Sequence, residues 1–423
     1  MSETLTEFER LLAQARTEML NGSAASVAID DQPILNGVPY KAFRQSVSLS
    51  ERRSAGTFFS GADLSREIAS LLHDASPTAG LVLDPTCGMG DLLIAYASLL
   101  PIGRTLAETL EQWGLQIAGI DQREDLIAMA KARLVAMARA RGCFRERMTT
   151  LDNVFPNIVV GDMFTSHETI AGAQGFLFNP PFGGTIDHTD PKWGAGKISA
   201  AALCLDFLVQ NRHPAAPIAA ILPEVLRCGS RYSRFRAHLA EAGIGGGFMS
   251  RDRFDRWTDV DVFTTLLMNV DAPLWASRGQ ADDTIGSRFI VRVGPVVPHR
   301  HDNKGRWQPY ICAKSVPAWS DSFVPTANRR FKGTLFTPPF VVIRRTSSPS
   351  DRRRAVGAII VGDRPVAVEN HLVVALPKSG GLQSCIELLA LLGSDETTNY
   401  LNAMIRCRHL TTGSIMSIPW QPA

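Results

Sequence analysis

Four short apolar runs of the sequence each end in a glycine turn or a polar motif, and helix-like segments separate them. The runs are residues 81–83, 116–120, 157–160 and 175–178, and they are followed by Cys87–Gly90, Asp121, Gly161–Asp162 and Asn179–Pro181. Strands that alternate with helices at this spacing are typical of βαβ units in a parallel sheet. We therefore predict an α/β fold in which the four ends meet at one edge of a doubly wound, mostly parallel sheet.

The rest of the sequence comprises a helical N-terminal segment, a further stretch of α/β pattern and a C-terminal region with a different pattern. We predict helices at residues 3–21, 62–73, 92–100, 124–141, 199–210 and 231–242, and a fifth strand at 218–222. After residue 271, Val and Ile runs at 289–293, 340–343, 358–361 and 372–376 alternate with Pro, Gly and Ser clusters, and a helical stretch follows near 383–403. This pattern predicts a mostly β domain. We expect a helical segment at 1–50, one domain at 51–275 and a second at 276–423.

The formal net charge of +3 hides an asymmetry. Residues 285–423 carry 18 Lys and Arg against 8 Asp and Glu, a net of +10, whereas residues 1–284 carry 26 against 33, a net of −7. A basic part beside an acidic part is typical of a chain in which the basic part binds a polyanion.

The seven cysteines are scattered and show no spacing typical of a zinc site, so we predict no metal centre. No run of 18 uncharged apolar residues occurs, and we expect no membrane-spanning helix. The N-terminal stretch lacks the basic and apolar pattern of a signal peptide. Together these features predict reduced thiols and a cytoplasmic protein.

The first motif, Asp84-Pro-Thr-Cys-Gly88-Met-Gly90, follows the first predicted strand. Glycines at this place let a ligand approach the backbone closely. The spacing is not that of a phosphate-binding loop, and Asp84 would repel a pyrophosphate, so a cationic or hydroxyl-bearing ligand is favoured. A tight strand-to-helix turn without a ligand is the alternative.

Two further aspartates follow the second and third predicted strands. Asp121 lies where a carboxylate can accept hydrogen bonds from both ribose hydroxyls of a nucleoside. Asp162 can accept a hydrogen bond from an exocyclic amine, while Met163 or Phe164 can pack on a purine face. Asp121 taken alone is equally well explained as the cap of an ordinary turn, and the Asp162 motif taken alone is a weak signal.

The fourth strand ends in Asn179-Pro180-Pro181-Phe182, which by itself could be a rigid turn. In this order, the four motifs resemble the S-adenosylmethionine-dependent N6-adenine DNA methyltransferases of the gamma arrangement, a group that includes type I modification subunits and stand-alone type II enzymes. The similarity runs from about Gly56 to Met268, and the Asn-Pro-Pro-Phe motif is its most specific part. Enzymes that methylate cytosine N4, RNA or protein glutamine share this motif.

The resemblance implies a Rossmann-like class I methyltransferase domain, a C-terminal DNA-recognition domain and S-adenosyl-L-methionine as cofactor. The cofactor-binding residues that it implies are Thr57, Phe58, Asp84, Thr86, Gly88, Gly90, Asp121, Asp162 and Met163. Thr57 and Phe58 belong to a segment that closes over the methionine moiety in this group. In this sequence Ser60-Gly61 stands where the family has Thr-Pro.

The catalytic residues implied are Asn179, Pro180, Pro181 and Phe182. If the Asn179 side-chain oxygen and the Pro180 carbonyl each accept one N–H, the target nitrogen is held pyramidal with its lone pair aimed at the sulfonium methyl. Phe182 would stack on the base. No Cys nucleophile is needed, and we expect no lowered pKa for Cys87, because its neighbours are acidic.

A base inside a duplex must be flipped out to reach such a pocket. A second stacking aromatic is then expected, and the candidates are Phe254 and Trp257. In the basic region, Arg329, Arg330, Arg344 and Arg353 belong to arginine clusters that we expect to contact phosphates and guanine edges. An ordinary solvated face is the alternative.

The combined prediction is an enzyme that methylates adenine N6 at a specific sequence in double-stranded DNA. Three alternatives remain: an enzyme for another amine (cytosine N4, RNA adenine or protein glutamine), a DNA-binding subunit of a modification or defence complex, and a subunit that needs a specificity or restriction partner.

Overall fold

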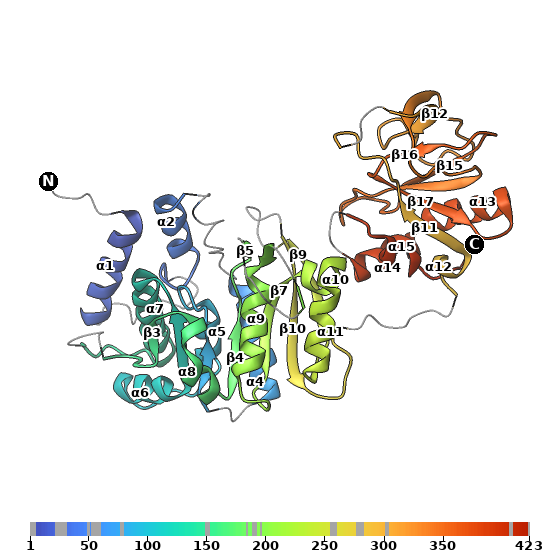
Figure 1. Ribbon diagram of the computed structural model, residues 1–423. Coiled ribbons are helices and arrows are strands. Elements are labelled where there is room, and N and C mark those ends of the chain that lie inside the picture. The colour runs from blue at the N-terminus through green and yellow to red at the C-terminus, as the bar shows by residue number, and fades with distance from the viewer. Residues whose placement is uncertain are drawn as a thin grey trace. The chain divides into compact units, whose positions relative to one another are not determined.

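The computed structural model describes residues 6–21, 32–48, 51, 61–76, 80–148, 153–182, 185–187, 193–194, 197–253, 260–275, 283–300, 304–405 and 409–421. The chain forms two compact units (Figure 1). The first comprises residues 1–227 and 232–276, and the second comprises residues 228–231 and 277–423. No helix among the described residues is long and apolar enough to cross a membrane.

An eight-stranded sheet forms the centre of the first unit. Its strands are β1 (Val82–Asp84), β2 (Ile117–Asp121), β3 (Ile158–Val160), β4 (Gly175–Phe178), β7 (Ile218–Pro223), β8 (Ile244–Gly245), β9 (Phe248–Arg253) and β10 (Asp261–Asn269). The order is β3-β2-β1-β4-β7-β10-β8, and β9 also pairs with β10. The first five strands are parallel, while β10 is antiparallel to its neighbours. The order reverses between β1 and β4, which creates a topological switch point there.

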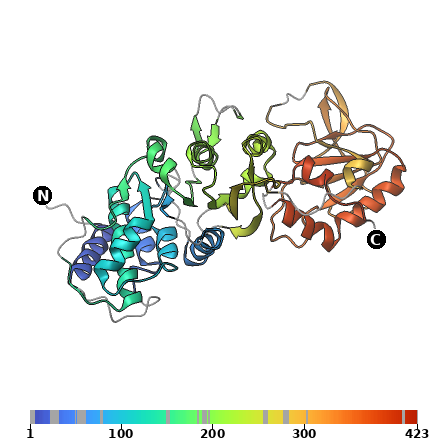
Figure 2. The same ribbon diagram turned by 90° about the horizontal axis from the view of Figure 1, so that it is seen from below.

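Helices cover both faces of this sheet (Figures 1 and 2). On one face, α4 (Gly61–Ala75), α5 (Asp91–Ala97), α6 (Leu106–Gln116) and α7 (Glu124–Gly142) contribute to one hydrophobic core. On the other, α8 (His167–Gly172), α9 (Ala200–Asn211) and α11 (Ser233–Glu241) contribute to a second core. Strands β1, β4 and β7 are buried along their whole length, which explains why they read as continuous apolar runs in the sequence.

The N-terminal helices belong to the same body as the sheet. Both α1 (Glu7–Asn21) and α2 (Val38–Ser46) bury apolar side chains, among them Phe8 and Phe43, in the core that α7 also lines. The predicted helical segment at the start of the chain therefore has no core of its own. The sequence pattern had left the region of α2 unassigned and had not indicated α6.

The second unit is mostly β, as predicted. Strands β11 (Phe289–Val293), β17 (Leu372–Pro377), β14 (Phe340–Arg344) and β15 (Gly357–Ile360) form an antiparallel sheet in that order. A smaller sheet has the order β13 (Ala327–Phe331), β12 (Arg306–Ile311) and β16 (Ala367–Val368). The helices are α12 (Ile285–Arg288), α13 (Gly381–Leu392), α14 (Asp395–Met404) and α15 (Thr412–Met416), and α13 packs against β14, β15 and β17. The predicted combination of an α/β domain and a mostly β domain is confirmed.

Candidate functional site

The carboxyl ends of β1 and β4 lie side by side at the switch point, and a short chain of hydrogen bonds joins them. Asp84 ends β1 and is 2% exposed. Its Oδ1 accepts the Thr86 N–H at 3.0 Å, and the Thr86 hydroxyl donates to the Asn179 carbonyl oxygen at 3.3 Å. The turn after β1 and the Asn-Pro-Pro motif after β4 are therefore held together, although the sequence separates them by about 90 residues.

The glycine turn is shaped by close packing beneath it. Gly88 and Gly90 adopt left-handed backbone angles, with φ of 52° and 80°. A Cβ at position 90 would also meet the Ala130 side chain of α7 at 3.0 Å. Below the turn, a Cβ on Gly119 of β2 would come within 2.9 Å of Leu93 and 3.0 Å of the Cys87 sulfur. The turn therefore lies directly on α7 and β2.

Asp121 ends β2 and holds the turn from the other side. Its two carboxylate oxygens accept the Gly88 N–H at 3.0 Å and the Arg123 N–H at 2.9 Å. A carboxylate offers about four acceptor positions, so both oxygens keep capacity for further donors. This is the chemistry required to bind a pair of vicinal hydroxyls.

Burial dominates the electrostatics of this edge. It raises the pKa of Asp84 from 3.8 to about 8, which the Thr86 N–H opposes and the negative charge of Asp121 reinforces. Burial also raises the pKa of Asp121, although the N–H groups of Arg123 and Gly88 lower it. Two buried carboxyl groups that repel each other provide a place for a cationic or hydroxyl-bearing ligand.

Cys87 is a buried thiol in the same turn. Burial raises its pKa well above the ordinary value, and Asp84 and Asp121 add to the shift. The expectation that this cysteine lacks a lowered pKa is therefore confirmed, and its thiol is unsuited to act as a nucleophile.

The end of β3 contributes a third carboxylate. Asp162 Oδ1 accepts the Phe164 N–H at 2.9 Å and caps the short helix Met163–Thr165, while Oδ2 accepts from Gln122 Nε2 at 3.0 Å. Gln122 follows β2 directly, so the second and third strand ends are linked. Met163 is 4% exposed and packs in the core, whereas Phe164 is half-buried and makes an edge contact with Phe207. In this structure Phe164 therefore offers more surface to a ligand than the predicted Met163.

The motif after β4 lies between the two cores of the first unit. Pro180 is buried, and Phe182 is half-buried and packs against both cores. The chain then forms the hairpin β5 (Thr185–Asp187) and β6 (Lys197–Ser199). Trp193 anchors this segment, because its indole N–H donates to Asp206 at 2.9 Å and its ring lies 4.6 Å from Phe235.

A buried arginine that the sequence analysis missed supports the glycine turn. Arg133 of α7 is 2% exposed and donates to the carbonyl oxygens of Met89 (2.7 Å) and Ile34 (2.9 Å) and to Asp91 Oδ1 (2.8 Å). The Tyr40 hydroxyl of α2 also donates to Asp91 Oδ1. The N-terminal helices are thereby tied to the turn. The available signal was that Lys131 and Arg133 are the two charged residues within the otherwise apolar stretch 126–138 of a predicted helix.

A second missed cluster lies at the end of β7, the strand next to β4. Glu224 is 1% exposed and accepts hydrogen bonds from Arg227 (2.8 Å) and from the Ser250 hydroxyl (2.6 Å). The Arg227 guanidinium lies 4.0 Å from the centre of the Phe248 ring. This buried pair fastens β9 to the strand-end edge. Thr57 and Phe58, like the candidate stacking residues Phe254 and Trp257, lie outside the described residues.

The structure divides the predicted DNA-contacting arginines into two groups. Arg329 and Arg330 lie on β13, which pairs with β12. Arg344 instead donates to the Val316 carbonyl oxygen at 2.9 Å, and Arg353 pairs with Asp395. Arg344 and Arg353 therefore have partners within the second unit.

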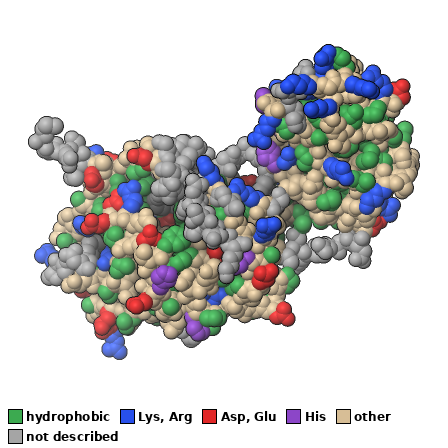
Figure 3. All heavy atoms as spheres, viewed as in Figure 1, with side chains coloured by type: hydrophobic (Ala, Val, Ile, Leu, Met, Phe, Trp, Pro, Cys, Tyr) green, Lys and Arg blue, Asp and Glu red, His purple; other side chains and the backbone are tan. Residues whose placement is uncertain are grey.

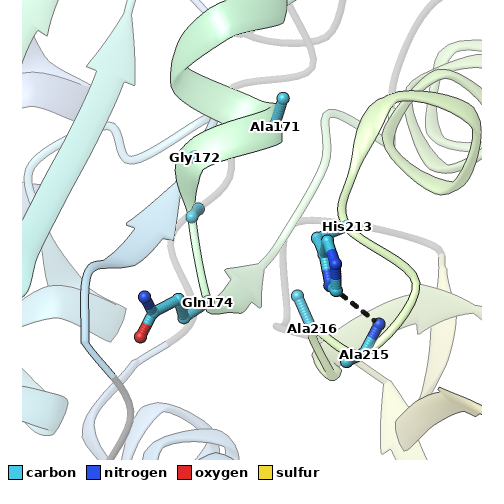
Figure 4. Close-up of a pocket in the computed structure, with 7 residues that line it drawn as sticks. Ala171, Gly172, Gln174, His213, Ala215 and Ala216 are labelled. Carbon is cyan, nitrogen blue, oxygen red and sulfur yellow. Dashed lines mark hydrogen bonds between the residues drawn. The ribbon is translucent and has the colours of Figure 1, made fainter.

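One cavity lies away from this site. It measures about 290 Å³ and is lined mainly by small residues next to the amino ends of β4 and β7, with His213 accepting the Ala215 N–H (Figure 4). The amino ends lie at the sheet edge opposite to the aspartates, so the cavity has no part in the strand-end chemistry. Among the described residues, no group of three or more His, Cys, Asp or Glu is arranged to hold a metal ion.

Comparison with known proteins finds a solved structure with a similar fold. No protein-family model matches the sequence, and no curated protein matches it either. Among solved structures, the chain is similar to the type IIL restriction-modification enzyme MmeI in complex with DNA, with a TM-score of 0.53 at 12% identity over 92% of this chain and 70% of that chain. The two proteins share a fold. At this identity the likeness shows the fold alone.

Two other solved structures are more distant. The type IIG restriction endonuclease BpuSI gives a TM-score of 0.47 at 12% identity, over 91% of this chain and 61% of that chain. A type I restriction-modification methyltransferase subunit from Streptococcus thermophilus gives 0.39 at 14% identity, over 58% and 51%. This chain thus spans about half to two thirds of the length of these two proteins.

Proposed function

We propose that the protein transfers a methyl group from S-adenosyl-L-methionine to the N6 amine of a flipped-out adenine, at a specific sequence in double-stranded DNA. The observation that carries the proposal is the junction at the switch point. There the glycine turn after β1 and the Asn179-Pro180 pair after β4 are joined through Thr86. A cofactor at the turn and a target amine at the motif would meet at this junction.

The residues at the turn fit S-adenosyl-L-methionine. This cofactor supplies a sulfonium-bound methyl group, which is strongly electrophilic. Asp121 has acceptor capacity for the two ribose hydroxyls. Asp162 follows the neighbouring strand, β3, and its carboxylate would accept a hydrogen bond from the adenine amine. Asp84 is buried beneath the turn, where its ionised form would balance the positive charge of the methionine part.

Asn179 and Pro180 activate the target amine without removing a proton beforehand. The lone pair of an exocyclic amine is delocalised into the ring, so the amine is a poor nucleophile. Two acceptors in fixed geometry, the Asn179 side-chain oxygen and the Pro180 carbonyl, favour the pyramidal nitrogen and stabilise the positive charge that develops during transfer. Pro180 is buried, and Phe182 beside it packs against both cores, which favours a rigid geometry for the motif. Phe182 stacks on the base.

The likeness to MmeI supports DNA as the substrate, since that enzyme was solved in complex with DNA. A base reaches the motif only by leaving the duplex, which costs a few kcal/mol of pairing and stacking. The basic second unit supplies the phosphate contacts that offset this cost, since residues 285–423 have a net charge of +10. A partner subunit that adds specificity or restriction is compatible with this arrangement.

The test is a radiolabelled methyl-transfer assay on genomic duplex DNA of varied sequence, with Asn179→Ala as the control variant. We expect incorporation by the wild type and a loss of roughly 10²- to 10³-fold in the variant, because one of the two acceptors is gone. Binding of S-adenosylmethionine, measured by calorimetry, should be retained by both proteins. No incorporation above the variant, on any of the DNA samples, would refute the proposal.

A further inference from the structure

The smaller sheet of the second unit ends in a basic two-stranded ribbon formed by β12 and β13. We propose that this ribbon reads the DNA sequence from within the major groove. The inference rests on the proposed function, because it assigns one element of the second unit to recognition of the DNA substrate. The sequence analysis expected only that basic residues of this unit contact DNA. The present inference assigns sequence recognition to β12 and β13 and distinguishes their arginines from those that stabilise the fold.

The ribbon extends beyond the sheet that supports it. Strands β12 and β13 pair from Arg306 opposite Phe331 to Tyr310 opposite Ala327, whereas the third strand, β16, pairs only with Tyr310 and Ile311. The Arg306 end of the ribbon is therefore two-stranded. Phe331 is 7% exposed and packs with Val296 and Ala367, which anchors the ribbon in the unit.

Basic side chains dominate the two-stranded end. Arg306 and Arg330 are exposed, as are the flanking Lys304 and Lys332. Neither β12 nor β13 contains an acidic residue. In Figure 3, Lys and Arg side chains gather over the part of the second unit that carries β12 in Figure 1. Such a surface attracts a polyanion.

Aromatic rings order the arginines of the ribbon. The Arg330 guanidinium lies 5.4 Å from the centre of the Trp307 ring, which is 55% exposed, and the Arg329 guanidinium lies 5.7 Å from the Tyr310 ring. Stacking leaves the edge of a guanidinium open for two parallel hydrogen bonds. An arginine that is already oriented also loses less side-chain entropy when it binds.

Other arginines of the second unit are committed to the fold. Arg354 is fully buried and donates to Ser347 (2.8 Å), Asn402 (2.6 Å) and the Ile405 carbonyl oxygen (3.2 Å). Arg345 donates to the Asn370 carbonyl oxygen at 3.1 Å. The exposed Arg306 and Arg330 are therefore better placed to reach a DNA groove than these side chains.

The shape of the ribbon favours the major groove over a phosphate-only contact. That groove admits a two-stranded β-ribbon, and guanine presents two acceptors there that match a guanidinium. Trp307 and Arg330 stand opposite each other across the ribbon, so both face the same side of it. We assign Arg330 to a guanine edge, and Trp307 to holding Arg330 in the reading orientation.

The experiment compares the full-length wild type with Arg330→Ala and Trp307→Ala, and uses Arg288→Ala as the matched control. Arg288 pairs with Asp283 and its guanidinium lies 5.1 Å from the centre of the Trp420 ring, so its loss removes the same charge and the same kind of ring contact from the same unit. Each protein is allowed to select duplexes from a pool with a randomised core, and its affinity for the selected and for scrambled duplexes is measured by fluorescence anisotropy at several salt concentrations. Circular dichroism and S-adenosylmethionine binding verify that each variant is folded.

We expect Arg330→Ala to lose preference at one or two positions of the selected sequence, by roughly 5- to 150-fold per position, and Trp307→Ala to lose less at the same positions. Arg288→Ala should select the same sequence as the wild type. A uniform loss of affinity for all sequences in the ribbon variants would overturn the inference, because it would show phosphate contact only. Unchanged selection would overturn it as well. Because binding is measured without methyl transfer, this experiment can refute the role of the ribbon without refuting the proposed reaction, and the methyl-transfer assay can do the reverse.

Discussion

The strand-end edge of the first unit and the β12–β13 ribbon of the second use charge in opposite ways. At the strand ends, Asp84 and Asp121 are carboxylic acids whose pKa values burial raises. On the ribbon, Arg306 and Arg330 are exposed, and no acidic residue stands on either strand. The net charge of +3 averages over these two surfaces and describes neither.

Burial decides what each charged residue contributes. Arg133 and Arg354 are as basic as the ribbon arginines, yet both are buried and bind carbonyl oxygens of the protein itself. A charge count assigns all four residues to the same class. Their burial separates the two arginines that hold the backbone in place from the two that are exposed on the ribbon. The following predictions probe this division.

The largest effect is expected from removing the arginine under the glycine turn. Arg133→Met leaves the buried Asp91 carboxylate without its cation and the Met89 carbonyl oxygen without this donor. We expect the first unit to lose about 3–5 kcal/mol of stability, measured as a shift of its denaturant unfolding transition. Arg66→Ala, which breaks an exposed pair with Asp63 and a hydrogen bond to the Ala62 carbonyl oxygen, should leave that transition nearly unchanged. Similar curves for the two variants would show that Arg133 does not support the turn.

A smaller effect is expected at the proposed ribose contact. Asp121→Ala removes a carboxylate that holds the Gly88 N–H and that would accept two hydroxyls. We expect S-adenosylmethionine to bind roughly 10- to 100-fold more weakly by calorimetry. Asp125→Ala is the control, because Asp125 pairs with the Arg123 side chain at the surface. Equal affinities of the two variants for S-adenosylmethionine would show that the cofactor does not bind at the end of β2.

The most gradual effect concerns pH. The Asp84 pKa is raised from 3.8 to about 8, so the folded protein holds a proton that the unfolded chain releases between these values. Without ligand, the free energy of unfolding should therefore fall as pH rises through this window, by at most about 1.4 kcal/mol per pH unit from this group. In Asp84→Asn the decline should be shallower. Denaturant unfolding at several pH values checks this, and parallel curves for the two proteins would contradict it.

The strand ends could be predicted from the sequence because their signals are local. The predicted strand Gly175–Phe178 matches β4, since an apolar run followed by Asn-Pro-Pro can hardly continue as a strand or a helix. The glycine turn could also be predicted, because glycines directly after an apolar run indicate a turn, and Gly88 and Gly90 do adopt the left-handed backbone angles that glycine favours. Repeating such strand–turn–helix signals was enough to predict the sheet.

What could not be predicted depends on contacts between distant residues. The cluster of Tyr40, Asp91 and Arg133 joins three helices, and nothing in the residues around any one of them indicates the other two. The burial of single arginines could not be predicted for a related reason, because adjacent residues such as Arg353, which is half-buried, and Arg354, which is fully buried, look alike in the sequence. The resemblance indicated a strand at residues 262–268, which β10 matches, but not its antiparallel direction, since an apolar run carries no sign of its direction in the sheet.

The central claim is that Asn179 and Pro180, joined to the glycine turn, methylate adenine N6. The most direct measurement is nucleoside analysis by mass spectrometry of duplex DNA that has been incubated with the protein and S-adenosylmethionine. We predict N6-methyladenine in DNA treated with the wild type and at most a trace after treatment with Asn179→Ala. N4-methylcytosine in place of methylated adenine, or equal amounts of N6-methyladenine from both proteins, would contradict the account.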